Sequence, residues 1–179
     1  MFSIKCGKKT WLFTGAILFL AAVSNFILFQ FIKEPDQQSV HINMVTDLND
    51  PRKLAGLAEN IFVGKVISQA GTKSLSQLPE TQFNVEVIQN IKGNLSGTVL
   101  VNQQGGYNQD QELVLVENDP LLKPGHTYLF STRYLQQEDW HTVIPIHGDV
   151  PLKSTSELQA KILNIKKAVQ QQIQFQPEK

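Results

Sequence analysis

The chain has 179 residues, with sixteen Lys and Arg against sixteen Asp and Glu, so its formal net charge at pH 7 is zero. Three lysines precede residue 11 and every acid follows residue 33, which leaves residues 33–179 with a net charge of −3. A weakly acidic surface is not typical of a general nucleic-acid binder, and we expect no nucleic-acid partner. The one cysteine is Cys6, so the remainder of the chain must be stabilised by its core without an internal disulfide.

Residues 11–32, WLFTGAILFLAAVSNFILFQFI, form a long apolar run without a formal charge. At about 1.5 Å per helical residue this run spans roughly 33 Å, which matches the hydrocarbon core of a bilayer. Lysines precede the run and nearly balanced charges follow it, so the positive-inside rule places residues 1–10 in the cytoplasm. The sequence therefore predicts a single-pass signal anchor in the cell membrane, with the C-terminal domain extracellular.

A cleaved signal peptide is the competing interpretation, because Ala22 and Ser24 have the spacing of a cleavage site before Asn25. Cleavage there would leave FILFQFI exposed at the mature terminus, and the run exceeds the usual signal-peptide length, so the uncleaved anchor is favoured. Polar residues in the run, Ser24, Asn25 and Gln30, would suit a helix–helix contact in the bilayer. The role of Cys6 stays open.

Residues 33–49 are polar and carry no burial pattern, so we expect a linker there. Asp50 followed by Pro51 predicts the start of a short helix that runs to about Asn60, because Asp caps helices and Pro suits their first position. The expected organisation is a cytoplasmic tail at 1–10, the transmembrane anchor at 11–32, the linker at 33–49, an extracytoplasmic domain at 50–173 and a tail at 174–179.

Short segments with apolar alternation then follow one another, separated by turn residues, and predict six strands. They are 61–68, 81–93, 98–103, 112–118, 127–134 and 140–146. Asn94 to Gly97 predicts a hairpin turn, and Pro124 with Gly125 predicts a type II turn. A capping box, Ser154 with Glu157, opens a final amphipathic helix. Its apolar face is Leu158, Ile162, Ile165, Val169 and Ile173.

This order predicts a mainly β fold, a small closed barrel or sandwich between a short N-terminal helix and a C-terminal amphipathic helix, preceded by one transmembrane helix. The segments Val63–Val66, Phe83–Gly106 and Leu121–Ser131 together resemble those of mostly uncharacterised bacterial exported, membrane-anchored proteins. The resemblance covers residues 58 to about 150 and implies an OB-like barrel, similar to netrin-like metalloproteinase inhibitor domains. Those inhibitors direct an N-terminal cysteine at zinc; residues 33–179 contain no cysteine, so that mechanism is not implied here.

Histidines are the first candidates for metal chemistry, and the sequence has four, His41, His126, His141 and His147. His141 and His147 share a strand face, but a straight strand separates them by roughly 20 Å, and zinc-motif spacing is absent. His141, His147 and Asp149 remain the candidates for a metal if Pro145 bends the strand. We expect solvated or turn histidines, no cofactor and no catalytic residues, with an exported metal-dependent hydrolase as the alternative function.

Binding is the broader hypothesis, because barrels of this kind present loops and an open sheet face. The polar segment 103–111 predicts a loop that displays Tyr107 beside two glycines, and Trp140 stands beside polar residues at a strand edge. The candidate binding residues are Gly105, Gly106, Tyr107, Arg133 and Trp140. The aromatic stripe of Tyr128, Phe130 and Tyr134 is expected in the core. We interpret the chain as an extracytoplasmic domain that binds a protein partner or an envelope glycan; the alternative is an accessory subunit acting through its transmembrane helix.

Overall fold

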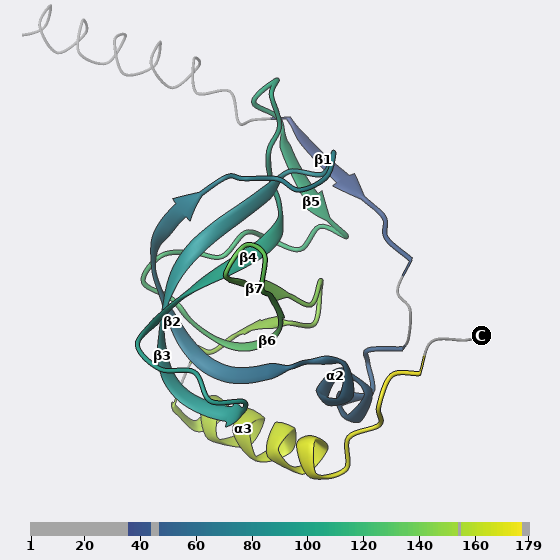
Figure 1. Cartoon of the computed structure of the whole chain (residues 1–179), viewed down its shortest axis with the longest axis vertical. Coiled ribbons are helices and arrows are strands. Elements are labelled where there is room, and N and C mark those ends of the chain that lie inside the picture. The colour runs from purple at the N-terminus through teal and green to yellow at the C-terminus, as the bar shows by residue number, and fades with distance from the viewer. Residues whose placement is uncertain (1–35, 44–46, 154, 177–179) are drawn as a thin grey trace, which may run out of the picture. The chain divides into compact units, whose positions relative to one another are not determined.

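Five strands close into a barrel in the computed structural model, which describes residues 36–43, 47–153 and 155–176 (Figure 1). The elements are β1 (Gln37–Val40), α2 (Pro51–Leu57), β2 (Asn60–Gly71), β3 (Glu80–Lys92), β4 (Thr98–Tyr107), β5 (Leu113–Val116), β6 (Thr127–Leu135), β7 (Trp140–Val143), β8 (Asp149–Pro151) and α3 (Thr155–Gln170). The sheet runs in the order β4, β3, β2, β6, β7, and β7 then pairs with β4 in parallel, which closes the ring. This is the five-stranded arrangement of an OB-type barrel.

The predicted mainly β, OB-like barrel with a helix on each side in sequence is therefore confirmed. The predicted transmembrane helix at 11–32 and the tail at 1–10 lie outside the described residues. Within the described ranges, neither helix is long and apolar enough to cross a membrane. The predicted hairpin between β3 and β4 is present, with the two strands antiparallel.

Aromatic and branched side chains fill the barrel, because every second residue of each strand points inward. Phe62 stacks on Phe130 with ring centroids 5.1 Å apart. Gly64 lies at this contact, where an added Cβ would come within 2.6 Å of Val85 Cγ1. The buried members of the interior are Phe62, Val66, Phe83, Val85, Val101, Leu122, Tyr128, Phe130 and Val143. Tyr128 and Phe130 thus belong to the core, as expected, whereas Tyr134 is 41% exposed.

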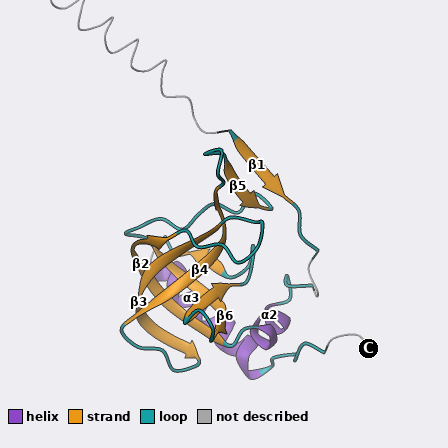
Figure 2. Ribbon diagram, turned by 45° about the horizontal axis from the view of Figure 1, so that its top comes forward, coloured by secondary structure: helices purple, strands orange, loops and turns teal. Residues whose placement is uncertain are grey.

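A second core lies on the outside of the barrel, where α2 and α3 lie side by side and cover outward-facing residues of β2 and β6 (Figures 1 and 2). Its buried members are Leu48, Leu54, Ala55, Ala58, Ile61, Val63, Leu129, Ile144, Ile165 and Ala168. Leu158, Ile162 and Val169 pack against it, which confirms the predicted apolar face of the final helix. Ile173 lies beyond the helix and is 42% exposed, and Ser154 of the predicted capping box lies outside the described residues.

Three local predictions differ from the structure. Part of the expected linker forms β1, which pairs in parallel with β5 from Gln37↔Leu113 onward. The first helix ends at Leu57 because Asn60 already pairs with Thr132 as part of β2. A further strand, β8, pairs with β6. In each case the partner strand is distant in sequence, so local pattern does not reveal the pairing.

Candidate functional site

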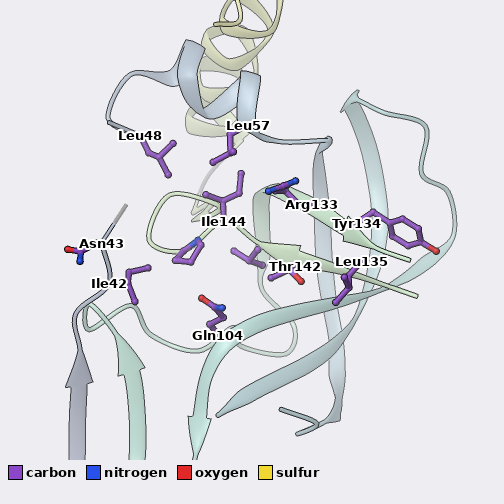
Figure 3. Close-up of a pocket in the computed structure, with 12 residues that line it drawn as sticks. Ile42, Asn43, Leu48, Leu57, Gln104, Arg133, Tyr134, Leu135, Thr142 and Ile144 are labelled. Carbon is purple, nitrogen blue, oxygen red and sulfur yellow. The ribbon is translucent and has the colours of Figure 1, made fainter. Parts of the chain in front are cut away.

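An open, mostly apolar groove of about 470 Å³ lies between the outer surface of β6 and β7 and the segments that lead into and form α2 (Figure 3). Ile42, Leu48 and Leu57 form one side of it. Leu135, Thr142 and Ile144 form the opposite side. Arg133 is the charged residue in the lining, and Gln104 is among the polar ones.

Hydrogen bonds to Glu117 place Ile42 at the groove. Glu117 Oε1 accepts the Ile42 N–H at 2.9 Å, and Glu117 Oε2 lies 2.7 Å from His41 Nδ1. These contacts stabilise the carboxylate, so the pKa of Glu117 is lowered, mainly by the Ile42 amide and next by His41. The segment after β1 is therefore tied to the end of β5, and its apolar residue is held against the barrel.

A capped first turn places Leu57 at the groove. Asp50 Oδ1 accepts the Arg52 N–H at 2.9 Å, and Pro51 occupies the first helical position, as the sequence predicts. The Arg52 side chain also bonds to Asp50 and, with the Arg52 amide, lowers the pKa of Asp50 to about 2. Leu54 of this helix is buried in the core, and Leu57, the last residue of α2, follows it by about one turn and lies at the groove.

Arg133 projects from the outward face of β6, and its side chain is 60% exposed. Its Nε lies 3.7 Å from Glu59 Oε1, a long ion pair at the surface. Glu59 itself is fixed, because its Oε2 accepts the Tyr134 N–H at 2.8 Å. Arg133 therefore has a neighbouring Glu as its ion-pair partner, while most of its side chain stays exposed.

The ring of Tyr134 points away from the groove, although its residue lines the rim (Figure 3). Its hydroxyl donates to Asp139 Oδ1 at 2.7 Å, and this bond is the main cause of a raised Tyr134 pKa. The ring lies 5.0 Å from the ring of His141. His141 is only 7% exposed, so the expectation of a solvated histidine is wrong there, and burial lowers its pKa. The imidazole is thus neutral at pH 7.

Gly105, Gly106 and Tyr107 do not form the predicted loop; they are the end of β4 and pair with β5. Both glycines are buried with positive φ, and a Cβ on Gly106 would lie 2.6 Å from Thr81 Oγ1. Pairing with β5 supplies the hydrogen-bond partners that a loop would lack, which is why the strand continues. Tyr107 is exposed, at 52%, but none of the three lines the groove.

Trp140 is buried, at 2% exposure, so its predicted place on the surface is wrong. The loop between β2 and β3 covers it: Lys73 Nζ lies 5.9 Å from the Trp140 ring and pairs with Glu138. The Lys73 backbone is fixed in turn by both ends of the Gln82 amide. The burial therefore comes from a loop whose path the local sequence does not indicate.

The proposed metal candidates are not assembled into a site. Across residues 36–43, 47–153 and 155–176, no group of three or more His, Cys, Asp or Glu side chains is placed to hold a metal ion. Asp149 is buried and accepts a hydrogen bond from Gln103 Nε2 at 2.9 Å.

Sequence reasoning missed the apolar side of the groove and two buried polar clusters. For the apolar side of the groove, the available sequence signal was Leu48, an isolated apolar residue just before the Asp50 helix cap. Asn102 donates to Glu80 Oε2 at 2.9 Å and accepts from Gln82 Nε2 at 2.6 Å, all three being buried. The other cluster joins Asp149 to Asp119. These two residues lie thirty positions apart, so no local sequence pattern indicates their contact.

No family model matches the chain, and no curated protein matches it significantly. Among solved structures, the crystal structure of yeast Stn1 and Ten1 is similar at 10% identity and a TM-score of 0.37, over 82% of this chain and 80% of that chain. A similarity of this size identifies neither a family nor a function. The barrel assignment rests on the strand pairings.

Proposed function

We propose that this chain is a membrane-anchored, non-enzymatic binding protein whose groove beside Arg133 holds an apolar segment of a partner protein that carries an acidic group. The residues 11–32 would anchor it, and the positive-inside rule would direct the barrel to the extracytoplasmic side. The groove would then lie in the extracytoplasmic compartment. Both the anchor and the location derive from the sequence pattern alone.

The observation that carries the proposal is an apolar lining with one accessible cation. The volume of about 470 Å³ lies within the range of binding pockets, and burial of apolar ligand surface there is favourable. Within the described ranges, the ion pair of Arg133 is a long, half-exposed contact with Glu59. A ligand carboxylate can therefore form a closer, bidentate pair with the guanidinium.

The lining favours a protein segment over the other partner classes. Glycans and single-stranded nucleic acids are commonly held on exposed aromatic faces, in the latter case within a basic groove. Here the Tyr134 ring points away from the groove (Figure 3). Trp140 is covered by the β2–β3 loop. Leucine and isoleucine side chains instead match aliphatic side chains of a peptide.

Site-specific photo-crosslinking in cells tests the proposal. The full-length chain would carry the photoreactive residue at Leu135, in the groove, or at Lys166, on the exposed face of α3, as the matched control. We expect the Leu135 position to capture a protein segment with aliphatic and acidic residues, and Arg133→Glu to abolish that capture. Equal capture from Lys166, or capture unchanged by Arg133→Glu, would refute the groove as the site. Capture of glycan or nucleic acid would refute the ligand class.

A further inference from the structure

Two aspartates, Asp119 and Asp149, contact each other through their carboxyl groups. Asp149, the first residue of β8, is 6% exposed, and its Oδ2 accepts from Gln103 Nε2. Asp149 is the more deeply buried of the two, and Asp119 already accepts the Ile146 N–H, so Asp149 carries the proton and donates the hydrogen bond to Asp119. A carboxyl–carboxylate contact of this kind requires one proton on the pair.

The pair holds a strained turn. The N–H of Ile146 donates to Asp119 Oδ2 at 3.2 Å, and Ile146 has φ of 71°, a conformation that β-branched residues rarely adopt. The same turn leaves no room at Gly148, where a Cβ would lie 2.5 Å from Ile144 O. The Asp119 carboxylate is thus one of the contacts that keep residues 144–149 in this shape.

Other polar groups face the pair from each neighbouring element. His147, in the turn, stabilises the Asp119 carboxylate, and the Tyr128 hydroxyl of β6 lies near both acids while it accepts the Lys123 N–H at 3.1 Å. Gln103 of β4 is neutral. Burial, followed by the charge of Asp119, raises the pKa of Asp149 to about 7, and burial also raises the pKa of Asp119.

We propose that Asp119 and Asp149 form a proton-operated latch. With the shared proton bound, Asp119 stays in place as the acceptor for the Ile146 N–H. When the proton is lost, the two carboxylates repel each other, and the turn at 144–149 is released. Ile144 and Pro145 of this turn line the groove, so the groove is best formed at acidic pH. That consequence rests on the proposed function, whereas the latch itself does not.

The sign of the pH dependence follows from proton binding. The folded pair keeps its proton up to about pH 7, whereas an unfolded Asp loses it near its ordinary value of 3.8. Between these values the folded state binds more protons, so folding stability falls as pH rises. Above about pH 7 both states are ionised and this dependence ends.

Thermal unfolding of the full-length chain in mild detergent tests the latch. We expect the wild-type Tm to fall by about 5 °C or more from pH 5 to pH 8. Asp149→Asn keeps an acceptor for Gln103 and a donor for Asp119 without a titratable proton. Its Tm should therefore fall by less than half of the wild-type decrease between pH 5 and pH 8. Asp110→Asn, at an exposed turn residue, should keep the wild-type profile. An Asp149→Asn profile equal to that of the wild type would overturn the proposal.

A second measurement keeps the proposal testable if Asp149→Asn does not fold. The amide NMR shift of Ile146 in the wild-type chain should titrate between pH 5 and 8, because its acceptor is Asp119 Oδ2. An Ile146 amide that does not respond over this range would overturn the latch. Neither measurement involves the binding partner, so failure of the latch and failure of the groove as a binding site are distinguishable.

Discussion

Arg133 Nε lies 3.7 Å from Glu59 Oε1, while the other oxygen of Glu59 accepts the Tyr134 N–H at 2.8 Å. The backbone therefore holds the carboxylate, and the guanidinium is the partner that is free to move. Exposed ion pairs of this length contribute about 0–1 kcal/mol, so exchange of Glu59 for a ligand carboxylate costs little. This relationship supports the proposed recognition of an acidic, apolar segment in the groove.

The predicted anchor fixes which side of the membrane each residue occupies. In intact cells, an impermeant maleimide should label Ser96→Cys, placed at an exposed turn, and should leave Cys6 unlabelled until the membrane is permeabilised. Each cysteine would be tested in a chain that lacks the other. Protection of Ser96→Cys in intact cells would contradict the proposed orientation, and loss of residues 1–24 from the mature chain would establish signal-peptide cleavage.

Removal of a barrel aromatic should destabilise the domain strongly. Phe130 is fully buried and stacks on Phe62, so Phe130→Ala should lower the free energy of unfolding by about 3–5 kcal/mol. Tyr107→Ala, at a half-exposed strand end, should change it by less than about 0.5 kcal/mol. Urea denaturation measures both. Similar losses in the two variants would contradict the assigned interior.

The buried cluster around Asn102 should be sensitive to loss of its central amide. Asn102→Leu removes the donor to Glu80 and the acceptor for Gln82, and leaves the Glu80 carboxylate buried without that hydrogen bond. We expect a loss of about 2–3 kcal/mol in the free energy of unfolding. Asn94→Ala, at an exposed turn position, is the matched control and should be nearly neutral. An equally small effect at Asn102 would show that the cluster contributes little.

Gly56 accommodates the segment after α3. A Cβ there would lie 1.9 Å from the Ile173 carbonyl oxygen, and the Ile173 N–H donates to Arg52 O at 3.0 Å. Gly56→Ala should therefore destabilise the full chain but have much less effect in a chain that ends at Gln171. A double-mutant cycle by urea denaturation should give a coupling energy of about 1 kcal/mol or more. Additive effects would contradict this contact.

Features set by neighbouring residues were predictable from the sequence. The Asp50–Pro51 helix start follows from capping chemistry, and the Pro124–Gly125 turn is present, with Gly125 at φ of 83° and the His126 N–H donating to Lys123 O. Inward alternation likewise identified most strands and the core positions of Tyr128 and Phe130. These features depend on residues within a few positions of one another.

Features set by distant contacts were not predictable in the same way. Trp140 is buried because the loop that contains Lys73 folds over it, and Gly105 continues β4 because β5 returns beside it. The groove joins the segment before α2 and the last residue of that helix to the outer surface of β6 and β7. Only Arg133 among the predicted site residues lines it, since no local pattern encodes where these segments meet.

The affinity of the captured partner segment for paired variants at Arg133 and Glu59 tests the central claim most directly. Calorimetric titration of the full-length chain should show Arg133→Gln weakening binding by about tenfold, because a charge-assisted pair is lost. Glu59→Gln retains an acceptor for the Tyr134 N–H but removes the competing charge, so binding should tighten severalfold. Affinities unchanged in both variants would contradict recognition of an acidic group by Arg133 in this groove.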